Sequence, residues 1–238
     1  DDENQTSASR SFSITVQNIA PSDHFNTSIY NGSGASQSIT TGFAPDFTWI
    51  KSRSNGTWHC VADTVRGNLS RIFPNDAYQQ VTNNNGFLSF DSNGFNLDGQ
   101  GGGGDVNTSG RTYVAWSLKA GGAAVANTDG IISTQVSANT TLGFSVITYD
   151  GATNATADTS NNSGTYWNVA HGLGATPDLV LVKKTSGAGG WYVGGAALSS
   201  TGSNGNHLAL NTTAAQVGEA NILWGGSQTF NATTFGLG

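Results

Sequence analysis

Apolar and polar side chains alternate along several stretches of this chain, and alternation with a period of two residues is typical of half-buried β-strands. The pattern is clear in residues 11–19 and 111–119, and a further strand is predicted at residues 131–136. Two shorter runs, residues 47–50 and 179–182, are continuously apolar, which predicts central strands buried on both faces. Together these patterns predict an all-β fold.

A set of anchor residues occurs twice along the chain in the same order, which indicates an internal repeat. The matching pairs are residues 25–32 with 144–151, residues 42–51 with 174–183, Trp58 with Trp191, Asn75 with Asn211, and residues 95–97 with 235–237. The offset grows from 119 (25 to 144) to 140 (95 to 235), so the repeats differ by loop insertions. We therefore predict two tandem β-sandwich (jelly-roll) repeats, at residues 23–120 and 131–238, joined by a linker at residues 121–130.

Both ends of this arrangement leave alternatives open. Residues 1–22 form either the last strand of a preceding immunoglobulin-like module with its linker, or a strand that joins the sheet that follows. The first repeat ends in the strand predicted at residues 111–119, with Tyr113 and Ala115 on one face and Trp116 on the other. The second repeat has no equivalent strand. Either the polypeptide continues, or another chain supplies the closing strand.

The amino-acid composition argues against several classes of function for this chain. Charged residues make up 10% of the chain, against about 25% in typical proteins, so Asn, Ser, Thr and Gly must supply the polar surface. The net charge of −6 argues against a nucleic-acid partner, since phosphates need clustered Lys and Arg. No apolar run approaches the roughly 20 residues that span a bilayer. The first residues lack the pattern of a signal peptide, and the absence of Met suggests a processed chain or a fragment.

One dense polar cluster is the candidate ligand site. Trp58 could offer its ring face to a sugar, while His59, Asp63 and Arg66 could hold a sugar hydroxyl. The alternative is structural, with Asp63 and Arg66 as an ion pair that fixes a loop and His59 bonded to backbone groups. The second repeat lacks this cluster although it keeps its other anchors, which favours the structural alternative.

The sequence contains no pattern of catalytic or cofactor chemistry. It has no nucleophile elbow, no Walker loop and no zinc-ligand spacing, and the acids near the glycine stretch, Asp91, Asp98 and Asp105, lack the alternation of a calcium loop. Cys60, the only cysteine, lies within an apolar pattern and is predicted to be a small buried hydrophobe. We predict no enzyme activity, no cofactor and no metal.

Asn-x-Ser/Thr sequons are frequent. They are Asn4, Asn26, Asn31, Asn55, Asn68, Asn107, Asn139, Asn154, Asn161, Asn211 and Asn231. In a secreted archaeal or eukaryotic protein these residues would accept glycans. In a protein assembled in bacterial cytosol they would serve turn formation instead, because Asn side chains bond nearby backbone.

The first repeat resembles a repeat found in tail-fibre and other virion proteins of bacteriophages. The resemblance is carried by residues 25–32, 42–51, 59–67, 89–95 and 113–120, and more weakly by residues 144–151 and 171–178 of the second repeat. It implies concanavalin-type sandwiches on a virion surface, outside the cell. On this basis we expect a tail-fibre or tail-appendage component that attaches to host glycans and assembles with other virion subunits, as a homo-oligomer. The alternative is a purely structural role in capsid decoration or in an extracellular filament.

Overall fold

The computed structural model of the chain describes residues 20–99, 105–151, 167–195, 198, 204–220 and 230–237. Apart from one 3-10 turn, η1 (Pro21–Asp23), the regular structure of these residues is β-strand, which confirms the all-β prediction. In this part of the chain, no helix has the length and apolarity needed to cross a bilayer. The strand predicted at residues 11–19 lies outside the described residues.

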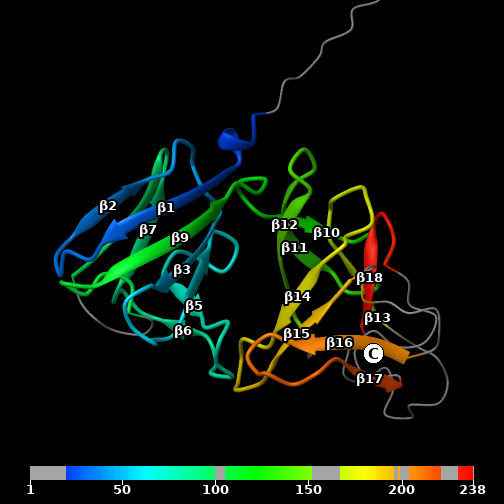
Figure 1. The fold of residues 1–238 in the computed structure, drawn as a ribbon. Coiled ribbons are helices and arrows are strands. Elements are labelled where there is room, and N and C mark those ends of the chain that lie inside the picture. The colour runs from blue at the N-terminus through cyan, green and yellow to red at the C-terminus, as the bar shows by residue number, and fades with distance from the viewer. Residues whose placement is uncertain are drawn as a thin grey trace, which may run out of the picture.

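The N-terminal half, residues 23–120, is built from two antiparallel sheets (Figure 1). Its strands are β1 (Phe25–Asn31), β2 (Gln37–Thr40), β3 (Phe47–Ser52), β4 (Cys60–Asp63), β5 (Ser70–Ile72), β6 (Val81–Thr82), β7 (Phe87–Asp91), β8 (Gly94–Leu97) and β9 (Thr112–Leu118). The larger sheet has the order β1-β9-β3-β4-β5-β6 and the smaller one the order β2-β8-β7.

The core of this half lies between the two sheets. Phe87 and Phe95 of the smaller sheet stack with ring centroids 5.6 Å apart, and they pack in one cluster with Ile50 and Ala115 of the larger sheet. Cys60 belongs to the same cluster and is fully buried, and burial raises the pKa of its thiol to about 11. The prediction that Cys60 acts as a small core residue is confirmed.

Strand β9 is an interior strand of the larger sheet, and its side chains alternate in burial as the sequence predicted. It pairs with β1 along one edge and with β3 along the other. Tyr113, Ala115 and Ser117 are fully buried. Tyr113 also stacks on Tyr30 of β1, with ring centroids 5.2 Å apart, so β9 links the sheet and the core.

The described residues of the C-terminal half (121–238) form three antiparallel sheets, with the orders β10-β11-β12, β13-β18 and β14-β15-β16-β17. Its strands are β10 (Val125–Asn127), β11 (Thr134–Asn139), β12 (Phe144–Tyr149), β13 (Trp167–Ala170), β14 (Val180–Lys183), β15 (Trp191–Gly194), β16 (Asn204–Ala209), β17 (Val217–Ala220) and β18 (Thr234–Leu237). Two predictions need correction. The predicted linker contains β10, and the strand predicted at residues 131–136 begins and ends three residues later, as β11, because Ile132 forms only an isolated bridge with Val169.

The two halves share their strand pairings. The order β14-β15-β16-β17 follows β3-β4-β5-β6, and the β13-β18 pair follows β2-β8. The Asn75 side chain accepts a hydrogen bond from the His59 N–H (2.7 Å), and the Asn211 side chain accepts one from the Trp191 N–H (2.9 Å). Trp191 therefore corresponds to His59, and its predicted match with Trp58 is wrong by one residue. The shared pairings cover part of each half, and the β1-β9-β3 arrangement has no counterpart among the described strands of the C-terminal half.

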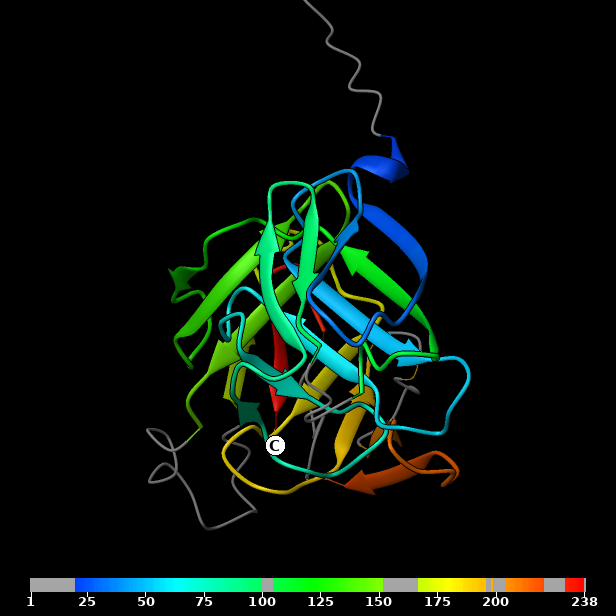
Figure 2. The same ribbon diagram turned by 90° about the vertical axis from the view of Figure 1, so that its left-hand side faces the viewer.

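The halves lie side by side in Figure 1, and in Figure 2 the N-terminal half lies in front of the C-terminal half. The two halves pack against each other. Trp191 of the C-terminal half is 4% exposed and forms a cluster with Val61 and Ile72 of the N-terminal half. Its indole N–H donates to the Phe73 carbonyl at 2.8 Å. Because this contact buries an aromatic ring and satisfies its polar atom, it joins the two halves firmly.

The apolar run at residues 179–182 was predicted to be buried on both faces, and this prediction is wrong. Leu179 is 61% exposed and Leu181 is 40% exposed. The corresponding residues of β3, Phe47 and Trp49, are only partly exposed. The physical reason is what packs against each strand. Phe47 and Trp49 pack against the cluster that contains Trp191 of the C-terminal half, and β9 lies beside β3. No described strand pairs with β14 along the corresponding edge.

Candidate functional site

Two large aromatic side chains lie together on the surface of the N-terminal half. Trp58, just before β4, is 39% exposed, and Tyr78, between β5 and β6, is 47% exposed. Their ring centroids are 5.6 Å apart and their planes differ by 31°. The buried ring of Phe73 supports Trp58 at 5.0 Å. We call Trp58 and Tyr78 the aromatic platform, because exposed apolar surface of this kind marks interaction sites.

The loop that carries Tyr78 is held in place from two sides. The Asp76 carboxylate accepts a hydrogen bond from the Tyr78 N–H at 2.8 Å, which fixes a local turn. The Gly189 N–H, from the C-terminal half, donates to the Ala77 carbonyl at 2.9 Å. The platform is therefore positioned partly by the packing of one half on the other, which reduces the entropy lost when a ligand binds.

Polar groups border the platform. The Gln80 N–H donates to the Thr185 carbonyl at 3.1 Å, so the loop also contacts the turn that follows β14. Burial lowers the pKa of Lys183 at the end of β14, while the negative charge of Asp76 opposes this shift. The Asp76 carboxylate therefore lies beside Tyr78 and close enough to Lys183 for the two charges to interact.

His59 is half-buried and faces away from the platform. Its Nδ1 accepts a hydrogen bond from the Trp49 indole N–H at 3.1 Å, and its backbone N–H is bonded to Asn75. Burial lowers the pKa of His59, and the nearby positive charge of Lys51 adds to the effect. The His59 ring is therefore a neutral hydrogen-bond acceptor for the Trp49 side chain of β3.

Asp63 and Arg66 form a buried ion pair. Their N–O distance is 2.6 Å, and their side chains are 3% and 7% exposed. Asp63 also accepts from the Arg66 N–H at 2.8 Å, and the guanidinium donates to the carbonyls of Val61 (3.2 Å) and Ser70 (3.4 Å). This is the structural alternative that the sequence left open: the pair connects a turn to β4 and β5.

The C-terminal half has no room for this cluster. The register of β14 and β15 places Gly195 where Asp63 lies in the N-terminal half. A Cβ atom at Gly195 would lie 2.0 Å from the Asp178 carbonyl oxygen, and its φ of 148° is unfavourable for other residues. Only glycine therefore fits at this position.

Of the four predicted ligand residues, only Trp58 belongs to the aromatic platform, and no sequence pattern points directly to its partner Tyr78. Tyr78 lies 20 residues away along the chain (58 to 78) in a segment without strand alternation. The one local signal is the Asp76-Ala77-Tyr78 order, in which a turn-forming Asp directs an aromatic residue outward.

The acids near the glycine stretch serve structure. Asp105 accepts hydrogen bonds from the side chains of Thr108, Arg111 and Tyr113, the last at 2.7 Å. Burial acts to raise the pKa of Asp105, but these bonds and the Arg111 charge outweigh it and lower the pKa. In the described ranges, His, Cys, Asp and Glu form no group of three that could hold a metal.

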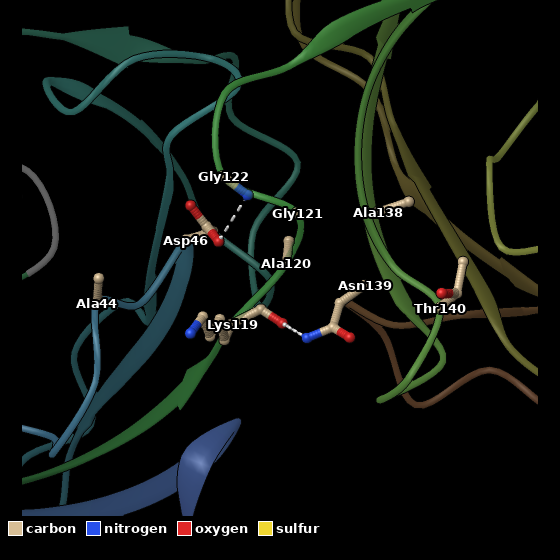
Figure 3. Close-up of a pocket in the computed structure, with 9 residues that line it drawn as sticks. All are labelled: Ala44, Asp46, Lys119, Ala120, Gly121, Gly122, Ala138, Asn139 and Thr140. Carbon is tan, nitrogen blue, oxygen red and sulfur yellow. Dashed lines mark hydrogen bonds between the residues drawn. The ribbon is translucent and has the colours of Figure 1, made fainter. Parts of the chain in front are cut away.

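A shallow hollow of about 370 Å³ lies where the first half passes into the second (Figure 3). Its lining residues are Ala44, Asp46, Lys119, Ala120, Gly121, Gly122, Ala138, Asn139 and Thr140. Asp46 accepts from the Gly122 N–H (3.2 Å), and the Asn139 amide donates to the Lys119 carbonyl (3.0 Å). The polar atoms bond each other across the hollow, which makes it a junction between the halves.

The structure places several sequons in turns. Asn107 is 4% exposed and its amide donates to the carbonyls of Ala35 and Asp98, so a glycan cannot be attached there without breaking the fold. The side chains of Asn139 and Asn231 each accept backbone N–H bonds two and three residues further on. Asn31, Asn55 and Asn68 are exposed. Asn4, Asn154 and Asn161 lie outside the described residues.

The strands and the aromatic platform define an all-β protein with a β-sandwich and a non-polar surface site. Residues 20–238 match the family described as Domain of unknown function (DUF7483), and the chain belongs to this family. No curated protein and no solved structure matches the chain.

Proposed function

We propose that this protein is a tail-fibre or tail-appendage component of a virion, and that it attaches to glycans on the host surface through the aromatic platform. The observation that carries the proposal is the contact between the exposed rings of Trp58 and Tyr78, the second of which lies on a loop held by both halves. The virion location rests on the resemblance of the first repeat to phage fibre proteins.

The chemistry of the platform suits a sugar. One face of a pyranose ring presents C–H groups that stack on aromatic rings, while its hydroxyls need polar partners. Asp76, two residues before Tyr78 and bonded to its N–H, lies next to the platform and supplies a carboxylate acceptor. The site is open and small, so each contact is weak, and useful attachment comes from many platforms on one particle.

Substitution of the platform tests this proposal. Trp58→Ala and Tyr78→Ala should each lower binding of the purified protein to isolated host-surface polysaccharide by about tenfold or more. Phe25→Ala is the matched control, because Phe25 is 40% exposed but lies on β1, outside the platform. Equal binding by all three variants, each with unchanged thermal unfolding, would contradict a glycan site at the platform.

A second candidate function is that of a structural subunit, in a capsid decoration or an extracellular filament. The observation that favours it is the firm packing of the two halves through Trp191. Antibody labelling of purified particles separates the two functions. Gold at the tail tip supports attachment, whereas gold over the capsid or along a filament supports the structural role.

A further inference from the structure

Positive charge gathers around the loop that carries Tyr78, although the chain as a whole is acidic. The chain has 9 Lys and Arg residues against 15 Asp and Glu residues, which gives a net charge of −6. Among the described cations, Arg66 and Arg111 pair with carboxylates and Arg71 is fully buried. The other cations in this part of the chain have no carboxylate within ion-pair distance, and they are Lys51, Arg53, Lys119, Lys183 and Lys184.

Strands β3 and β14 each have an acid before their first residue and a lysine at or near their last one. Asp46 precedes β3, which contains Lys51, and Asp178 precedes β14, which ends at Lys183. Each acid is separated from its lysine by five residue steps (46 to 51 and 178 to 183), a length of about 16 Å in an extended chain. The acids and the lysines therefore lie at opposite ends of these strands.

The lysine ends of both strands approach one loop of the N-terminal half. The Asn75 side chain accepts a hydrogen bond from the His59 N–H at 2.7 Å, and Lys51 lies close enough to the His59 ring for its charge to act there. The charge of Asp76 acts on Lys183 in the same way. Because Asn75 and Asp76 are neighbours in the chain, one lysine from each half lies near the same loop.

Lys184 adds a third positive charge, on the turn between β14 and β15 that lies beside this loop (Figure 1). The Gly189 N–H donates to the Ala77 carbonyl at 2.9 Å, which joins the turn to the residue before Tyr78. A Cβ atom at Gly187 would lie 3.4 Å from the Lys184 Nζ, and one at Gly189 would lie 3.7 Å from the Lys184 Cβ. The exposed Lys184 side chain therefore lies along the turn that contacts the Tyr78 loop.

The two neighbouring lysines repel each other, and one carboxylate is close to them. The Lys183 ammonium donates to the Lys184 carbonyl at 2.7 Å. Burial lowers the pKa of Lys183 and the Lys184 charge adds to this effect, while the Asp76 charge opposes it. The Asp76 carboxylate also accepts the Tyr78 N–H at 2.8 Å. A bound anion would offset the repulsion between the lysines, so the charge at this place favours negatively charged ligands.

We propose that the aromatic platform selects acidic polysaccharides, in which a sugar ring stacks on Trp58 and Tyr78 while carboxylate or sulfate groups are attracted by Lys183 and Lys184. This inference rests on the proposed glycan function and names the chemical class of its ligand. An ammonium on a flexible stem suits the task, because it can follow charged groups that repeat along a polymer. Opposite charges also steer the polymer to the site and raise the association rate.

Matched pairs of charged and neutral polysaccharides test the charge preference of the 238-residue protein. Polygalacturonate is compared with its methyl ester, and dextran sulfate is compared with dextran. The charged member of at least one pair should bind at least tenfold more tightly than its neutral partner, and the pair identifies carboxylate or sulfate as the group recognised. Its affinity should fall between about 0.05 M and about 0.3 M salt, because salt screens exposed charges. Equal affinities within both pairs would overturn the proposal.

Removal of single charges locates the site. Lys184→Gln should weaken binding to the charged polysaccharide about threefold, and Lys183→Gln combined with Lys184→Gln about tenfold, because each exposed charge contributes modestly. Lys119→Gln is the matched control. It removes the same charge at the other end of β3, where the Asp46 N–H bonds to the Leu118 carbonyl at 2.9 Å. An equal loss in the control and the double variant, each with unchanged thermal unfolding, would contradict a local site.

The glycan function and its preference for acidic ligands fail in different ways. If Trp58→Ala abolished binding to host-surface polysaccharide and the lysine variants retained it, the glycan function would stand and the acidic preference would be wrong. If the lysine variants lost binding and Trp58→Ala retained it, the platform would not be the glycan site and both proposals would be wrong. An oligothymidylate that bound as tightly as the charged polysaccharide would assign the rings and lysines to single-stranded nucleic acid and overturn the proposal.

Discussion

The two halves of this protein show how much one strand contributes to a β-sandwich. In the N-terminal half, β9 joins β1 to β3 into one continuous sheet. The side chains of β9 alternate between buried and partly buried along the whole strand. In the C-terminal half, the corresponding strands β12 and β14 lie in separate sheets, and Leu179 and Leu181 remain exposed. The other shared anchors are present in both halves. The repeated anchor residues therefore accompany the strand pairs that both halves share, whereas β9 connects β1 and β3 into one sheet.

The halves also differ in where their aromatic residues lie. Trp58 is exposed and forms the platform, whereas Trp191 is buried and joins the halves. The Asn211 side chain bonds the N–H of Trp191 itself, whereas the equivalent Asn75 bonds the N–H of His59, one residue after Trp58. A shift of one residue along a strand moves a side chain to the opposite face. The one-residue difference in position therefore puts Trp58 on the surface and Trp191 in the contact between the halves.

The largest expected effect on the free energy of unfolding comes from β9, the strand in which the two halves differ. Tyr113→Ala removes a fully buried ring and the hydroxyl that donates to Asp105, and should cost about 4–5 kcal/mol of unfolding free energy. Tyr149→Ala, at the corresponding place in the C-terminal half, should cost less than half as much because its ring has no stacked partner among the described residues. Urea unfolding of both variants measures the difference, and equal losses would contradict it.

The next effect concerns the contact between the halves. Trp191→Ala should cost about 3–4 kcal/mol, since it removes a ring that is 4% exposed and leaves the Phe73 carbonyl without its partner. Differential scanning calorimetry should then show two separated transitions where the native protein shows more closely coupled ones. Val125→Ala, on an exposed strand outside this contact, is the control and should leave the transitions unchanged.

The ion pair of the N-terminal half gives a somewhat smaller effect. Asp63→Ala should cost about 3 kcal/mol, because the buried Arg66 guanidinium loses its counter-charge. The double variant that also carries Arg66→Ala should lose less than the sum of the single losses. Strict additivity in urea unfolding would show that the two groups do not interact.

The smallest effect is a dependence of stability on pH. Burial lowers the pKa of both His59 and His171, with the Lys51 charge adding at His59 and the Asn231 carbonyl opposing at His171. The unfolded chain takes up protons below about pH 6.5, and the folded chain resists them. The free energy of unfolding should therefore be highest above this pH and should fall as the pH drops through the lowered pKa values of the two histidines.

The urea concentration at the midpoint of unfolding, measured at pH 8, 6 and 5, shows how steeply stability depends on pH. Replacement of both histidines by Gln should flatten it, whatever the change in absolute stability. The lowered pKa of Asp105 acts in a more acidic range: its contribution is present above about pH 4 and is lost as the pH falls further. A slope between pH 8 and 6 that survives the double replacement would assign it to other groups.

The sequence by itself determined the local structure of this protein. Alternation identified β9 and its buried face, apolar context identified Cys60 as a core residue, and repeated anchors identified the shared hairpins. Each of these features depends on residues that are close along the chain, where the two-residue period of a strand decides which side chains share a face.

Tertiary structure alone decided what covers each face. It buried Asp63 and Arg66, paired Trp58 with Tyr78 from a distant loop, and placed Trp191 between the halves. The same apolar pattern became a covered strand in β3 and a partly exposed one in β14. The physical reason is that a strand's period specifies its two faces but carries no information about the strand or domain that packs beside it.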